Sequence, residues 1–102
     1  MALGAFDRVM REAQKLQARM ARIQQELGEE RVEGSSGGGA VKVVCDGHQR
    51  VLEVRISPEV VDPDDVEMLE DLVLSAVRDA QERSRRLAEE KLGGIGLPGM
   101  PF

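Results

Sequence analysis

The sequence is poor in aromatic residues and cysteine. Of its 102 residues, two are Phe, one is Cys and none is Trp or Tyr. The core must therefore be built from aliphatic side chains, and a single domain of this length buries only a modest part of its surface. One cysteine excludes a disulfide within the chain and fits a reducing compartment.

Long apolar runs are also absent. No stretch approaches the ~20 apolar residues that span a bilayer, and the opening MALGAFDRVMREAQ lacks the apolar run of a signal peptide. We therefore expect a cytoplasmic protein with no membrane partner.

Negative charge dominates overall but is unevenly distributed. The net charge is -5, yet residues 1–28 carry five cations against three acids, a balance of +2 that leaves -7 for the rest. A basic arm on an acidic body is compatible with binding a polyanion, whereas a uniformly acidic chain is not.

Residues 3–28 are expected to form a long helix that ends at Gly28. Its apolar residues alternate at spacings of three and four, which is a full heptad pattern and predicts an apolar seam along one side. The seam is Phe6, Val9, Ala13, Leu16, Met20, Ile23 and Leu27.

Two or three antiparallel strands are expected to follow. Residues 29–34 could form a short, weak edge strand, and residues 34–39 form a flexible glycine-rich connector. Residues 40–46 and 49–57 form two strands joined by a type I′ turn at Asp46-Gly47. The inward faces are expected to carry Val41, Val43 and Cys45 on one strand and Leu52, Val54 and Ile56 on the other. Pro58 ends the sheet.

A second helix is expected to open at Asp62, which caps it, with Pro63 at its first position. Its outer face carries the i, i+4 pairs Arg78–Glu82, Glu82–Arg86 and Arg85–Glu89. Its core stripe is Val66, Leu69, Leu72, Val73, Ala76, Val77, Ala80 and Leu87.

The predicted fold class is α+β, with a small antiparallel sheet and two long helices on one side of it. Residues 1–92 form the single domain and residues 93–102 a flexible Gly/Pro-rich tail. A helix of this length, about 38 Å, overhangs a sheet of about 20 Å. Since the overhanging part of the seam would be an exposed apolar patch, we predict that the chain associates with a second copy. The alternative is that the second helix covers this overhang within the chain.

The cations of the first helix fall within a sector of ~80°, away from the seam. A ridge of this kind suits the phosphate backbone, although a solvated helix face is the other interpretation. With almost no aromatic side chains to stack on single strands, low-specificity binding to double-stranded DNA is the predicted mode. The ridge is Arg8, Arg11, Lys15, Arg19 and Arg22.

No catalytic or metal site is predicted. Cys45 and His48 are too few for a zinc site, which needs at least three protein ligands, and a Cys–His nucleophile needs an orienting group and an oxyanion hole. The predicted arrangement is a buried thiol beside an exposed turn histidine. The glycines do not match a P-loop. We expect no enzyme activity, no cofactor and no small-molecule substrate.

The whole chain resembles the YbaB/EbfC nucleoid-associated family. The matching segments are REAQKLQARMARIQQEL, VEGSSGGGAVKVVCDGHQRVLEVRISPEVV, EMLEDLVLSAVRDAQERSRRLAEEK and the ending LPGMPF. The start MALGAF differs, since relatives often carry a Gly- and Lys-containing lead there, so this chain has one positive patch fewer.

The resemblance implies an α-β-β-β-α protomer and a tweezer-like homodimer formed through the sheets. It also implies a nucleoid-associated protein that binds DNA and affects compaction and gene expression. The basic arm maps onto the five cations of the first helix, and the secondary DNA-binding candidates are Arg83, Arg85, Arg86 and Lys91.

A protein–protein interaction module is the alternative function. In this interpretation the helical arms or the tail of a dimer bind another protein, with Met10, Met20 and Met68 as adaptable contacts.

Overall fold

A computed structural model describes residues 2–93. The elements in chain order are α1 (Ala2–Glu29), β1 (Val32–Ser36), a short 3-10 turn (Gly37–Gly39), β2 (Val41–Cys45), β3 (Val51–Ile56), a second 3-10 turn (Pro58–Val60) and α2 (Val66–Gly93). The sheet is antiparallel with β2 in the centre. The predicted α+β class and element order are confirmed, and the expected tail lies outside the described residues.

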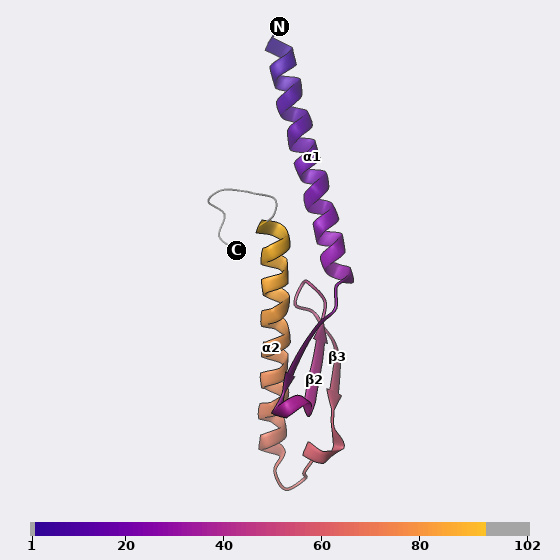
Figure 1. Cartoon of the computed structure of the whole chain (residues 1–102), viewed down its shortest axis with the longest axis vertical. Helices are drawn as coiled ribbons and strands as arrows, with labels where there is room; N and C mark the ends of the chain where they lie inside the picture. Colours follow the sequence, from indigo (N-terminus) through magenta and orange to yellow (C-terminus); the bar gives the residue numbers. More distant parts are fainter. Residues whose placement is uncertain (1, 94–102) are drawn as a thin grey trace.

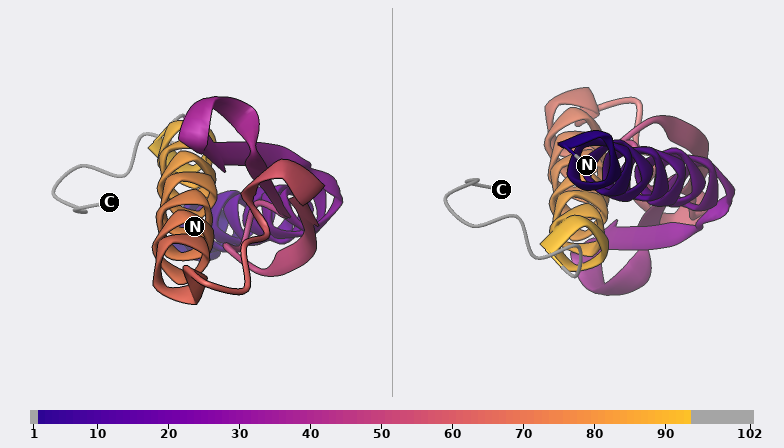
Figure 2. Two further views of the ribbon diagram at one scale, coloured as in Figure 1. Left: turned by 90° about the horizontal axis from the view of Figure 1, so that it is seen from below. Right: turned by 90° about the horizontal axis from the view of Figure 1, so that it is seen from above.

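The molecule is long and thin, at 78 × 24 × 16 Å. Figure 1 shows α2 running alongside the sheet, while α1 leaves the end of the sheet and extends beyond α2. The prediction that both helices cover the sheet is therefore wrong for α1. Viewed along the long axis, α2 lies against one face of the sheet (Figure 2). The overhang expected from the length of the first helix is confirmed.

The core lies between β2 and α2. Val41, Val43 and Cys45 alternate toward α2 and meet Ala76 and Ala80, all with no exposed surface. Small side chains on the helix let it approach the strand closely. The predicted core stripe holds for most of α2, but Val66 is 53% exposed because it stands at the first turn, beyond the sheet.

The first strand is displaced from its predicted position. It occupies Val32–Ser36, so Gly34 lies within the strand and only Gly37–Gly39 forms the connector. A Cβ on Gly34 would lie 2.2 Å from the backbone nitrogen of Ala80, so glycine is needed there for close packing. The connector glycines have φ between 58° and 95°, which glycine adopts without strain.

The hairpin between β2 and β3 is longer than predicted. The Asp46 N–H donates to the Arg50 carbonyl at 3.0 Å, and Gln49 adopts φ 65°. The type I′ prediction is therefore wrong: the left-handed residue is Gln49, as in three-residue hairpin loops. The buried Asp46 carboxylate holds this loop by accepting the N–H groups of His48 and Arg50 at 2.8 and 3.1 Å.

The second helix begins three residues later than predicted, at Val66 instead of Pro63. Asp65 rather than Asp62 caps it, accepting the Met68 N–H at 3.2 Å. Asp62 instead closes the preceding turn by accepting the Asp64 N–H at 2.9 Å. A local Asx turn thus competes with helix capping at this position.

Candidate nucleic-acid interface

The base of α1 is fixed to the body by three contacts. Leu27 is 1% exposed and its carbonyl accepts the Gly47 N–H at 2.7 Å. The His48 Nε2–H donates to the Gln24 carbonyl at 2.8 Å, in the last turns of the helix. The Lys91 ammonium of α2 lies 3.8 Å from the carboxylate of Glu26 in α1 and 3.2 Å from that of Glu30, which follows the helix. These contacts hold α1 at a fixed root while its N-terminal part stands away from the body, and we call residues 4–22 the arm.

None of the root contacts was predicted. Gly47 was interpreted as a turn residue, yet a Cβ there would lie 2.5 Å from the Leu27 carbonyl oxygen, so it allows close approach to α1. His48 was predicted to be an exposed turn residue, and the structure confirms that it is exposed. A hydrogen bond between residues 24 positions apart leaves no local sequence signal.

Five cations line the arm, and all are exposed: Arg8, Arg11, Lys15, Arg19 and Arg22. Within residues 2–93 only Lys15 of this set forms an ion pair, with Glu12 at 3.4 Å, and both side chains are about 70% exposed. Such a pair contributes little and is easily exchanged. The arm therefore presents available positive charge along one helix, as predicted from the wheel.

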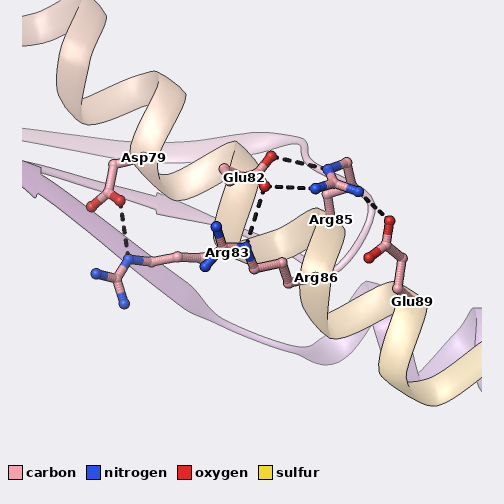
Figure 3. A network of polar contacts seen from close by, with 6 residues as sticks. All are labelled: Asp79, Glu82, Arg83, Arg85, Arg86 and Glu89. Atoms are coloured by element: carbon pink, nitrogen blue, oxygen red, sulfur yellow. Dashed lines mark hydrogen bonds and ion pairs between the residues drawn. The ribbon is translucent and has the colours of Figure 1, made fainter. Parts of the chain in front are cut away.

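The secondary candidates on α2 are neutralised by neighbouring acids (Figure 3). Arg83 pairs with Asp79 at 3.2 Å, Arg86 with Glu82 at 3.2 Å, and Arg85 with both Glu82 and Glu89. The predicted pairs Glu82–Arg86 and Arg85–Glu89 are confirmed. The expected Arg78–Glu82 pair does not form within the described part of the chain, because Glu82 is already shared by two other arginines.

Two acids of this network, Glu82 and Asp79, have lowered pKa values. Hydrogen bonds from Arg85, and then from Arg86, lower the pKa of Glu82 to about 2. The Ser35 N–H and then the Arg83 guanidinium lower the pKa of Asp79. Each arginine therefore has a fully charged partner at physiological pH, and this patch has little positive charge to offer a phosphate.

The opposite end of the molecule is acidic. Residues 59–71 contain seven carboxylates and no Lys or Arg, and they form the turn below β3 and the start of α2 (Figure 1). The basic arm and the acidic end therefore lie at the two extremes of the long axis. Within the described residues, the arm carries the largest group of cations on one element that have no acidic partner, whereas residues 59–71 would repel a polyanion.

Cys45 and His48 do not form a site. Cys45 is fully buried, and burial and then the neighbouring Asp46 raise the pKa of its thiol, which keeps it protonated and unreactive. His48 points instead to the carbonyl of Gln24. Among the side chains that the structure describes, no three His, Cys, Asp or Glu residues are grouped to hold a metal ion.

The profile of the YbaB/EbfC DNA-binding family matches residues 3–100. This chain belongs to the YbaB/EbfC family. A nucleoid-associated protein from Chloroflexus aurantiacus is 49% identical over 94 residues, covering 90% of this chain and 94% of the relative. A nucleoid-associated protein from Bacillus thuringiensis is 45% identical over 104 residues, covering 98% and 95%.

The fold is shared with a solved structure. The crystal structure of an uncharacterized protein from Helicobacter pylori matches with a TM-score of 0.78 at 15% identity, covering 90% of this YbaB/EbfC chain and 97% of the other. The likeness concerns the fold alone. Within residues 2–93, neither helix of this YbaB/EbfC protein has the length and apolarity needed to cross a bilayer.

Proposed function

We propose that this YbaB/EbfC protein binds double-stranded DNA through phosphate contacts made by the arm. The observation that carries this proposal is that Arg8, Arg11, Arg19 and Arg22 protrude from the body and have no ion-pair partner within the described residues. Unpaired cations on one helix release counterions from DNA without first breaking internal salt bridges. Binding is therefore broad in sequence and dependent on salt.

The site of action follows from the same chemistry. A chain that binds duplex DNA with low specificity accumulates on the chromosome, so we place it in the nucleoid of the cytoplasm. The names of the relatives from Chloroflexus aurantiacus and Bacillus thuringiensis support this placement. Occupancy of many sites would alter DNA compaction and the expression of nearby genes.

The functional unit is proposed to be a homodimer. Register places Val54 and Ile56 of β3 on the same face as Val41 and Val43, yet α2 packs mainly against β1 and β2. Val54 and Ile56 are consequently 45% and 39% exposed. Ile56 borders a mainly apolar groove of about 470 Å³, whose other wall is Leu69, Glu70, Val73, Leu74 and Val77 of α2.

This apolar flank is the surface that a second copy would cover. Exposed apolar patches of this kind mark protein interfaces, and an apolar edge strand is an aggregation hazard unless it is covered. Because the flank and the arm lie far apart on the molecule, a dimer formed through the sheets leaves the arm cations free for DNA.

DNA binding is tested by fluorescence anisotropy with random and A·T-rich duplexes at two salt concentrations. Replacing Arg11, Lys15 and Arg22 by Ala should weaken binding to both duplexes and reduce the salt slope by about 0.9 for each phosphate that is no longer neutralised. The matched control replaces Arg83, Arg85 and Arg86 by Ala, which removes the same number of charges from paired positions. Equal losses of affinity in the two variants would show that binding depends on net charge rather than on the arm.

The alternative, a protein-interaction module, draws support from the exposed apolar side of the arm, where Phe6 and Val9 are 62% and 65% exposed. It requires that the wild type retains no duplex DNA even at low salt. The same anisotropy titration therefore separates the two functions.

A further inference from the structure

Within residues 2–93, much of the apolar side of the arm is left exposed. The seam continues from Leu27, which is buried at the root, through Met20 to Phe6, and its outer part is increasingly exposed: Met20 is 36%, Val9 65% and Phe6 62% exposed. Leu16 and Ile23 are half-buried. The open part of the seam, residues 6–23, is about 27 Å long.

The spacing of this seam is that of a coiled coil rather than of a helix lying on a sheet. Its residues alternate at three and four, so Phe6, Ala13 and Met20 occupy position a of the heptad, with Val9, Leu16 and Ile23 at position d. Such a pattern is satisfied by another helix of the same length. The residues that flank the seam, at heptad positions e and g, then determine which partner helix is favoured and whether the two helices run parallel or antiparallel.

The flanking charges select one arrangement. The three positions e are Met10, Gln17 and Gln24, and the positions g within the arm include Glu12 and Arg19. In a parallel pair, g faces the partner's e, so Glu12 and Arg19 meet only uncharged side chains. In an antiparallel pair, g faces g, and Glu12 can meet the partner's Arg19 twice by symmetry.

We propose that the arm pairs antiparallel with the arm of a second copy. Glu12 lies opposite the partner's Arg19, Phe6 opposite the partner's Ile23, and Ala13 opposite the partner's Leu16. A shift of one heptad in either direction would place Glu12 against the partner's Glu12 or Arg19 against the partner's Arg19, and both contacts are repulsive. Charge complementarity therefore specifies both the direction and the register.

This contact differs from the proposed dimer interface and leaves DNA-binding charge available. The apolar flank of β3 and α2 lies toward the acidic end, whereas the seam lies at the other end of the molecule (Figure 1). Heptad positions c and f point away from the partner helix. They hold Arg8, Lys15, Arg22 and Arg11. A chain with both interfaces forms assemblies larger than a dimer.

The test is a charge swap, measured by sedimentation velocity of the full chain without DNA. Glu12→Arg and Arg19→Glu each create two repulsive pairs and should raise the concentration needed for arm pairing by about tenfold. The double variant E12R/R19E restores attraction with the two charges exchanged, so its association should return to within about twofold of the wild type, because the same number of pairs is attractive again.

Circular dichroism controls for folding, since both positions are exposed helix surface. Association of the single variants equal to that of the wild type, or a double variant as weak as the singles, overturns the antiparallel pairing. A wild-type chain whose mass never exceeds that of a dimer, and whose dimer is unaffected by the two single variants, overturns it too, since that dimer forms through another surface.

Discussion

At the scale of single residues, two glycines set how closely the elements of this protein approach one another. Gly34 brings β1 against α2, and Gly47 brings the hairpin against the last turn of α1. Neither has a positive φ, so the requirement at both positions is space rather than backbone freedom. A glycine-rich stretch in a sequence does not reveal which glycine is needed for packing, and the predicted connector was misplaced for this reason.

Gly34→Ala should destabilise the protein by about 1–3 kcal/mol. The added Cβ would lie 2.2 Å from the Ala80 nitrogen and 2.6 Å from its Cα, and neither backbone atom can move without displacing α2. Gly4→Ala is the matched control, since nothing lies within 4 Å of its Cβ. Thermal and urea denaturation measure both; equal stability of the two variants would contradict the close approach.

Asp79 connects β1 to α2 through its ionised carboxylate. It accepts the Ser35 N–H at 3.0 Å and pairs with Arg83, and these contacts hold the pKa of Asp79 below the ordinary value of 3.8. A carboxyl group with a lowered pKa binds protons more readily in the unfolded chain. Its contribution to stability is therefore present above the unfolded pKa and lost as the pH falls through the folded pKa.

We expect the free energy of unfolding to fall as the pH drops below about 4. In Asp79→Asn this fall should be shallower, because one of the groups that takes up a proton on unfolding is gone. The measurement is urea denaturation between about pH 2.5 and pH 7, values bracketing ordinary carboxyl groups. An unchanged pH profile in the variant would show that Asp79 does not contribute. Asp71→Asn is the control, since Asp71 is exposed on the same helix and forms no ion pair within residues 2–93.

At the scale of elements, the two helices have equal length but different support. Each has 28 residues, yet α2 is packed on the sheet along much of its length, whereas α1 is held only at its root by Leu27, His48 and Lys91. Helices without tertiary packing are marginally stable in water. The arm is therefore the least protected regular element of the protomer.

Hydrogen exchange should show a gradient of amide protection along α1. Amide protection should rise from Phe6 toward Leu27, and Ala76 and Ala80 of α2 should exchange most slowly. The experiment is best done on Val9→Asp, which places a charge in the seam and blocks arm pairing. Uniform protection along α1 in this variant would mean that the arm is packed against something within the protomer.

Most of the elements were predictable because their signals are local. Heptad spacing identified α1, alternation identified β2 and β3, and Pro58 marked the end of the sheet. The start of α2 was missed because Asp62 and Asp65 are both good caps, and only the fold decides between them. The sector of arm cations was predictable from the helix wheel, whereas the pairing of Arg85 and Arg86 with one shared carboxylate was not.

At the scale of the whole molecule, two apolar surfaces remain uncovered by the protomer itself. The seam of α1 was foreseen from its length, but the flank of β3 and α2 was not. The residues of β3 were assigned to the core by alternation, and the sequence holds no sign that α2 covers only part of the sheet. Coverage of a sheet by a single helix depends on the crossing geometry, which is not encoded locally.

If the proposed dimer forms through the sheets, Leu74→Glu should convert it into a monomer. Leu74 is 47% exposed on the groove-lining side of α2, so a carboxylate there is tolerated by the protomer but not in an apolar interface. Light scattering after size exclusion, in salt high enough to weaken arm pairing, measures the mass. Ser75→Glu, at the next position of the same helix, is the control; loss of the dimer in both variants would argue against this interface.

The separation of charge along the 78 Å axis makes each protomer an electric dipole. In the electric field of a highly charged polymer, such a dipole experiences a torque as well as an attraction, so the protein rotates before it contacts the polymer. The seven carboxylates of residues 59–71 are turned away from a polyanion during this approach, which would bring the N-terminal helix to the DNA first under the proposed function. The charge distribution of the fold therefore orients the protein before contact. This orienting effect weakens at higher ionic strength, because dissolved ions shorten the range of the electric field.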